Sequence, residues 1–191
     1  MQLSLSIENP DLPKHKCLAL GIFEDEKPPR GIGGLIDWRL NGMLSREIKN
    51  GRIGGGFKEK VIIPFPERIG SEILLLFGLG RVPDITYDRI YDVAYTVTQI
   101  IDSMAIKSFA FDLYGEGRAN LVTSDIVEAA VTGIFDFLAS DIEKLSEMNA
   151  CAVTSPSNLH SVAQGVRQFK NNVNDKGSVD ISPLEECLAK N

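Results

Sequence analysis

The sequence is poor in the side chains that most often bind metals or form cross-links. Its 191 residues include only three cysteines, two histidines and one tryptophan. Cys17, Cys151 and Cys187 lie far apart and form no CxxC or Cys/His spacing. We therefore expect reduced thiols, no metal site and no cofactor.

A basic excess and a long apolar run are also missing. The net charge of -6 and the pI near 5.0 argue against nucleic acid and anionic membranes as partners. No apolar segment approaches the roughly 20 residues that cross a bilayer. The first ten residues lack the basic and apolar pattern of a secretory signal. We therefore expect a cytoplasmic protein.

What is present is an ordinary globular composition, with 43% hydrophobic and 24% charged residues. The length suits one compact domain. We expect a single domain over residues 1–170 and a polar C-terminal tail over residues 171–191, loose at least from Asn171 to Ser182.

Apolar periodicity predicts alternating strands and helices. The predicted strands are residues 2–7, 16–23, 61–65, 73–78, 108–113 and 149–154, and the first two are expected to pair or flank one another. The predicted helices are residues 35–50, 86–104, 124–140 and a last one that follows Ser155 and Pro156. This order implies an α/β fold whose largely parallel sheet has helices on both faces.

The first predicted helix carries an apolar residue at every fourth position and ends at Gly51. The only tryptophan, Trp38, lies off that apolar ridge. It either borders the core or forms part of a subunit contact.

The region from Gly31 to Arg81 carries a resemblance. Residues 37–45 read DWRLNGMLS, residues 48–51 read IKNG, and the strand EILLLF ends in GLGR at residues 78–81. In this order and spacing they resemble the N-terminal domain of leucyl (cytosol) aminopeptidases, in which the corresponding strand ends in GLGK. The match covers about the first 105 residues in order, and the remainder more loosely.

The resemblance implies a macro-like, three-layer α/β/α fold with a mixed, largely parallel sheet of about six strands. In that family this domain carries no catalytic residues, packs beside a metal-binding peptidase domain and contributes to the oligomer. We therefore expect a non-catalytic accessory domain, here without the peptidase domain, that acts in self-association or binds a protein partner.

One short segment favours the opposite interpretation, a metal-binding catalytic site. Residues 115–118, GEGR, resemble the DAEGR element of the peptidase domain, in which Asp and Glu hold two metals. The position two before Glu116 is Tyr114 rather than Asp, and a lone carboxylate cannot hold two metals. We expect a plain loop, and neither a metal site nor a catalytic one.

A rival hypothesis is a binding module for a nucleotide-like or other anionic small molecule. Strand-end loops of parallel sheets and the helix starts beside them bind such ligands. Macro domains bind ADP-ribose-like ligands through a comparable glycine-rich loop, although their Asn-Ala-Ala-Asn element has no match here. Asp112, at the end of a predicted strand, is either a loop anchor or a ligand contact. The candidate ligand-binding residues are Gly78, Gly80, Gly115, Gly117, Arg118, Thr123 and Ser124.

Overall fold

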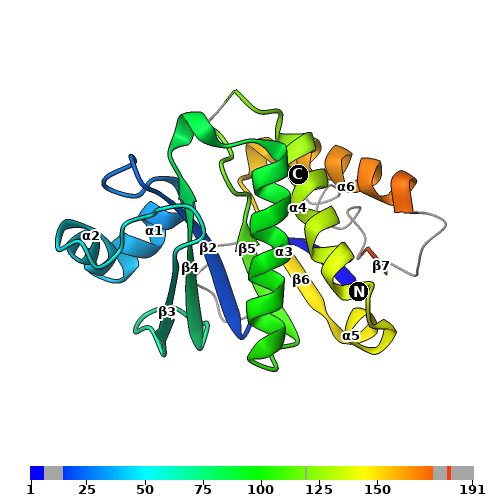
Figure 1. The fold of residues 1–191 in the computed structure, drawn as a ribbon, viewed down its shortest axis with the longest axis horizontal. Coiled ribbons are helices and arrows are strands. Elements are labelled where there is room, and N and C mark those ends of the chain that lie inside the picture. The colour runs from blue at the N-terminus through cyan, green and yellow to red at the C-terminus, as the bar shows by residue number, and fades with distance from the viewer. Residues whose placement is uncertain (7–14, 119, 174–179, 182–191) are drawn as a thin grey trace.

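The computed structural model describes residues 1–6, 15–118, 120–173 and 180–181. Its elements follow in chain order (Figure 1): β1 (Gln2–Ser6), β2 (Cys17–Phe23), α1 (Gly31–Arg39), α2 (Met43–Lys49), β3 (Lys60–Pro64), β4 (Ile73–Gly80), the 3-10 turn η1 (Val82–Asp84), α3 (Tyr87–Ser103), β5 (Ser108–Asp112), α4 (Thr123–Leu138), α5 (Ile142–Glu147), β6 (Asn149–Val153), the 3-10 turn η2 (Pro156–Asn158), α6 (Leu159–Val173) and β7 (Asp180–Ile181).

The strands form one seven-stranded sheet in the order β3-β4-β2-β5-β6-β1-β7. Among the strands that the structure describes, only β3, at one edge, runs antiparallel to its neighbour, and the other pairings are parallel. The predicted mixed, largely parallel sheet is confirmed, with the two-residue β7 added to the six predicted strands. The expectation that the first two strands neighbour each other is wrong, because β5 and β6 lie between β1 and β2. Alternation within a strand marks its buried face and does not select its hydrogen-bonding partner.

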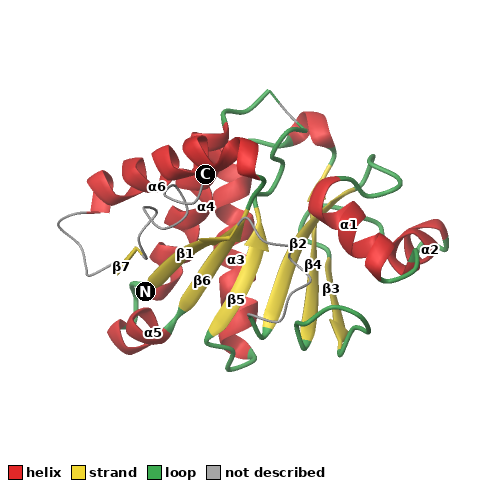
Figure 2. Cartoon of the chain, turned by 180° about the vertical axis from the view of Figure 1, so that it is seen from behind, coloured by secondary structure: helices red, strands yellow, loops and turns green. Residues whose placement is uncertain are grey.

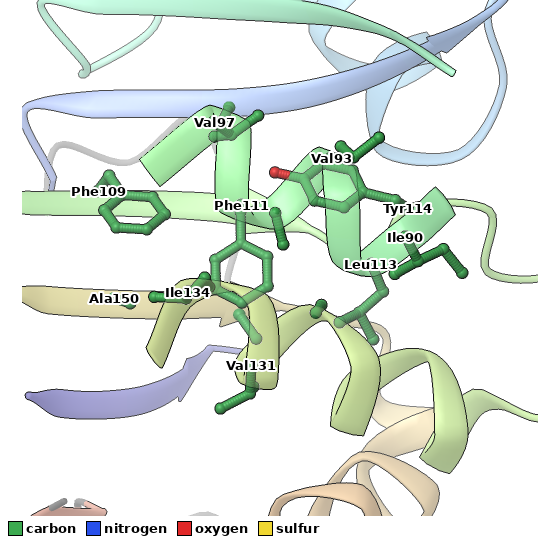
Figure 3. Packing of buried hydrophobic residues seen from close by; sticks show 14 of the residues in the cluster. Ile90, Val93, Val97, Phe109, Phe111, Leu113, Tyr114, Val131, Ile134 and Ala150 are labelled. Carbon is green, nitrogen blue, oxygen red and sulfur yellow. The ribbon is translucent and has the colours of Figure 1, made fainter. Parts of the chain in front are cut away.

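Helices cover both faces of the sheet, so the fold has three layers (Figures 1 and 2). Successive residues of β2 and β4 point to opposite faces, and both sets are buried. Leu18 and Leu74 pack with α1 and α2, whereas Ala19 and Leu75 pack with α3, α4 and α6. In the larger core, Phe109 and Phe111 of β5 meet Val97 of α3 and other apolar side chains of α3 and α4 (Figure 3).

The single helix predicted over residues 35–50 is wrong, because the chain forms two helices there. Asn41 and Gly42 both adopt left-handed backbone conformations, which end α1 before α2 begins. The buried Asp37 carboxylate joins the two helices, since it accepts the Ser45 N–H at 3.0 Å and the Ser45 hydroxyl. The apolar stripe still lies on one face because both helices pack against the same side of the sheet.

Trp38 has a 68% exposed side chain, so the structure excludes the core position for it. It lies on the outer side of α1, and the Arg39 guanidinium stacks over its ring at 5.2 Å.

The C-terminal part of the chain departs from the prediction in two places. Helix α5 was not predicted, although the Asp141 side chain caps it by accepting the N–H groups of Glu143 and Lys144. Helix α6 extends to Val173, and β7 pairs in parallel with β1, so these parts of the predicted tail are ordered. The rest of that tail lies outside the described residues. Within the part that is described, no helix combines the length and apolarity that crossing a bilayer requires.

Candidate functional site

A pocket of about 330 Å³ opens at the edge of the sheet where the parallel strands end. The carboxyl ends of β2, β4, β5 and β6 meet at this edge, which is uppermost in Figure 2. Four segments line the pocket: the end of β2 with its loop (Gly21, Phe23, Glu26 and Arg30), the start of α1 (Gly31 and Ile32), the end of β5 with its loop (Asp112, Leu113, Gly115, Glu116, Gly117 and Arg118), and residues near η2 (Ser155 and Asn158); Leu79 of β4 completes it.

Three of the seven predicted ligand-binding residues, Gly115, Gly117 and Arg118, line this pocket. The glycines adopt φ values of 85° and 68° and form the tight turn that carries Arg118 inward. Within the turn, the Glu116 N–H donates to the Leu113 carbonyl at 2.9 Å and the Arg118 N–H donates to the Gly115 carbonyl at 3.0 Å. Gly78, Gly80, Thr123 and Ser124 lie outside the pocket lining.

Gly78 and Gly80 have a different neighbour, the glycine-rich loop of residues 54–56. Gly78 accepts from the Lys58 N–H at 2.9 Å and donates to the Glu59 carbonyl at 2.8 Å, and the Gly80 N–H donates to the Gly55 carbonyl at 2.9 Å. A Cβ at Gly78 would lie 1.9 Å from the Gly56 oxygen. The strand-end glycines therefore allow two backbones to approach each other.

Thr123 and Ser124 are natural N-cap candidates for the helix predicted over residues 124–140, but they lie inside the first turn of α4; the N-cap is Val122, and no side chain caps this helix end. Ser124 is buried, and its carbonyl oxygen lies 2.2 Å from where a Cβ would stand at Gly165 of α6. Close packing of α6 therefore covers the first turn of α4.

Asp112 and Glu116 place two carboxyl groups in the pocket. The Gly21 N–H donates to Asp112 Oδ1 at 3.0 Å, so Asp112 anchors the end of β5 and also lines the pocket. Burial, strengthened by the nearby Glu116 charge, raises the pKa of Asp112 to about 7, although the Gly21 hydrogen bond opposes the rise. Burial also raises the pKa of Glu116, against hydrogen bonds from Asn158 and Thr154.

Arg118 supplies the positive charge, and it is paired within the protein. Its Nε donates to Glu26 Oε2 at 2.7 Å and its Nη1 to the Glu116 carbonyl at 3.3 Å. The guanidinium lies against the backbone of Gly31, where a Cβ would stand 2.6 Å from Nη2. The Arg30 N–H donates to the other Glu26 oxygen at 3.0 Å.

Sequence reasoning missed the contribution of Glu26, Arg30 and Gly31, because they lie between the strand predicted over residues 16–23 and the helix predicted from residue 35, in a segment to which it assigned no functional role. The sequence does contain a signal for these residues. Both β2 and β5 were predicted as strands of a parallel sheet, and the loops that follow such strands lie at the same edge, so the loop after β2 could have been placed beside the loop after β5.

Comparison with known proteins identifies the family. Residues 19–141, more than half of the chain, match the model described as "Cytosol aminopeptidase family, N-terminal domain". The chain belongs to the cytosol aminopeptidase family. Curated relatives that this chain is similar to include the probable cytosol aminopeptidases of Psychromonas ingrahamii, 28% identical over 123 residues, and of a Geobacter species, 26% identical over 137 residues. The matches cover 62% and 72% of this chain but 24% and 28% of those proteins, so the chain spans about a quarter of their length.

Solved structures show the macro-like fold of this aminopeptidase N-terminal domain. The Oceanobacillus iheyensis macrodomain with ADP superposes with a TM-score of 0.70 over 88% of this chain and 91% of that one, at 10% identity. The Trypanosoma brucei macrodomain in complex with ADP-ribose gives 0.69 over 86% and 68%, at 14% identity. A tomato leucine aminopeptidase mutant gives 0.55 over 84% of this chain and 34% of that one, at 17% identity. The predicted fold and family are both confirmed.

The GEGR segment forms a turn that lines the pocket. Tyr114, at the position where the DAEGR element has Asp, is buried in the core and packs on Phe111 with ring centroids 6.2 Å apart. Among the residues that the structure describes, no three His, Cys, Asp or Glu side chains group closely enough to hold a metal ion.

Proposed function

We propose that this aminopeptidase N-terminal domain is a non-catalytic, cytoplasmic binding module, and that its pocket takes a nucleotide-like anionic small molecule. The observation that carries the proposal is the position of Arg118. A charged side chain and a two-glycine turn enter one pocket at the carboxyl edge of a parallel sheet.

The chemistry of the pocket suits a ligand that has both an anionic group and hydroxyl groups. Arg118 and nearby backbone N–H groups favour phosphate or diphosphate. Asp112 and Glu116 repel phosphate when ionised but accept hydrogen bonds from sugar hydroxyls. A nucleoside diphosphate with a free ribose offers both kinds of group.

The fold supports the same class of ligand. The two macrodomains named above were solved with ADP and with ADP-ribose. Because their sequence identity to this chain is 10% and 14%, they make ADP-ribose the first compound to test by analogy of fold.

The Arg118→Ala variant tests the proposal. We expect ADP-ribose at 100 times its dissociation constant to stabilise the wild-type protein by about 2.7 kcal/mol in a thermal-shift assay. Calorimetric titration of Arg118→Ala should give binding at least about tenfold weaker, because a hydrogen bond to a charged group is worth about 1.5–3 kcal/mol.

Arg52→Ala is the matched control, since Arg52 forms an exposed ion pair with Glu47 and lies outside the pocket lining. It should bind ADP-ribose as the wild type does. If ADP, ADP-ribose and pyrophosphate all fail to stabilise the wild type, or if Arg118→Ala binds with unchanged affinity, the pocket does not have this function.

A second candidate function, self-association, is favoured by a groove between α1, α2 and the end of β3. Its apolar lining includes Leu40, Met43, Ile63 and Phe65, and the Phe65 side chain is 77% exposed. An aromatic side chain this exposed beside a groove is typical of a protein contact. We propose a second copy of the chain as its occupant.

Phe65→Asp should weaken this self-association at least tenfold, because it places a charge in the apolar contact. Sedimentation equilibrium over a wide range of protein concentrations measures the effect. Ile142→Asp, at an 82% exposed position on α5, is the matched control and should leave the association unchanged. A wild-type protein that stays monomeric throughout, or equal effects of the two variants, contradicts the second proposal.

A further inference from the structure

We propose that the Glu26 carboxylate occupies the anion-binding position of the pocket, and that an anionic ligand binds by displacing it. The inference rests on the proposed ligand-binding function. It adds that the Glu26 carboxylate competes with the ligand for the same donors, and that this competition sets the affinity of the pocket for each anion.

The two oxygens of Glu26 make the contacts that a bound phosphate or carboxylate would make. Oε2 accepts from Arg118 Nε at 2.7 Å, and Oε1 accepts from the Arg30 N–H at 3.0 Å. A guanidinium and a backbone N–H that converge on one anion are a common arrangement for phosphate recognition. In this structure both donors are directed at a side chain of the protein itself.

This ion pair is more buried than the surface pairs of the protein. The side chains of Arg118 and Glu26 are 22% and 12% exposed, whereas those of Arg52 and Glu47 are 72% and 26% exposed. The backbone of Gly31, with a φ of 58°, leaves room for the guanidinium. The Glu116 carbonyl, which accepts from Nη1 at 3.3 Å, gives the guanidinium a second partner besides Glu26.

Glu26 lies on the loop between β2 and α1, where Glu24, Asp25 and Lys27 are all exposed. A change in the Glu26 side-chain rotamer towards solvent would leave Arg118 and the Arg30 N–H free to bind an incoming anion.

The exchange favours anions of higher charge. A ligand must replace one carboxylate of the protein, so a monovalent anion gains little by the exchange. A diphosphate gains more, because it brings greater charge and further acceptor oxygens to the same donors. We therefore expect inorganic pyrophosphate to bind more tightly than phosphate, and acetate to bind least.

The test compares wild type, Glu26→Gln and Glu26→Ala by calorimetric titration with inorganic pyrophosphate and with ADP-ribose. We expect both variants to bind at least about tenfold more tightly than the wild type, because the competing charge has been removed. Glu24→Gln, an exposed position on the same loop, should bind as the wild type does. In an Arg118→Ala background the gain from Glu26→Gln should disappear, which shows that the two side chains act on one site.

Thermal melts of each variant establish that it is folded before titration. If the wild type binds ADP-ribose but neither Glu26 variant binds more tightly, the internal-competitor inference is overturned and the proposed function stands. If Glu26→Gln binds pyrophosphate and no protein binds ADP-ribose, the anion position is supported and the nucleotide-like ligand is wrong. If no protein binds either probe, both proposals are overturned.

Discussion

Gly78→Ala is expected to lower the free energy of unfolding by about 3 kcal/mol or more, the upper range for inserting an atom into a packed interior. The new Cβ would lie 1.9 Å from the Gly56 oxygen and 2.9 Å from the Gly56 carbonyl carbon. Neither contact can be relieved by a side-chain rotation, because both atoms belong to the backbone. The loop must move away and lose hydrogen bonds such as that from the Lys58 N–H to Gly78.

Urea denaturation of Gly78→Ala and wild type measures this loss, which should also lower the Tm by about 6–12 °C for a domain of this size. Gly56→Ala is the matched control. A Cβ at Gly56 meets nothing within 4 Å, so this variant should stay within about 1 kcal/mol of wild type. Equal unfolding midpoints for Gly78→Ala and wild type would show that the two backbones do not approach this closely.

Asp112→Asn is expected to reduce the pH dependence of the free energy of unfolding. The folded protein raises the pKa of Asp112 from 3.8 to about 7, chiefly by burial. Between these values the folded state binds more protons than the unfolded state, so the free energy of unfolding falls as pH rises. The stabilisation from this group is complete below pH 4 and is lost as the pH rises through 7.

The contribution of Asp112 to the free energy of unfolding should fall by about 2 kcal/mol between pH 4 and pH 7. This is less than the full pKa shift would give, because Asp112 is half-buried in a pocket open to solvent and water screens its charge. An asparagine keeps the oxygen that accepts the Gly21 N–H. The stability of Asp112→Asn relative to wild type should therefore increase between pH 4 and pH 7.

Urea unfolding at several pH values across this interval provides the measurement. The raised pKa of Glu116 acts in the same direction, so a smaller slope should remain in Asp112→Asn. Asp84→Asn, at an exposed position in η1, is the control and should keep the full wild-type slope. A constant difference between Asp112→Asn and wild type at every pH would contradict a raised pKa for Asp112.

The sequence by itself determined the type and approximate ends of most elements. The continuous apolar runs of β2 and β4 reflect burial on both faces of the sheet, and the four-residue repeat from Ile36 to Ile48 reflects the buried side of that segment. The same local information led to the family, because the order of its glycines and apolar segments is a property of the chain and needs no tertiary contact. The turn that brings Arg118 to the edge of the sheet was predicted on similar grounds.

Only the tertiary structure decided which of these segments meet. Glu26 and Arg118 are 92 positions apart, and no periodicity in either segment indicates that their side chains form a 2.7 Å ion pair. The clash expected at Gly78 depends in the same way on the approach of Gly56. A hydrophobic pattern specifies that a face must be buried, whereas the partner that buries it is selected by the packing of the whole chain, because apolar burial is non-directional.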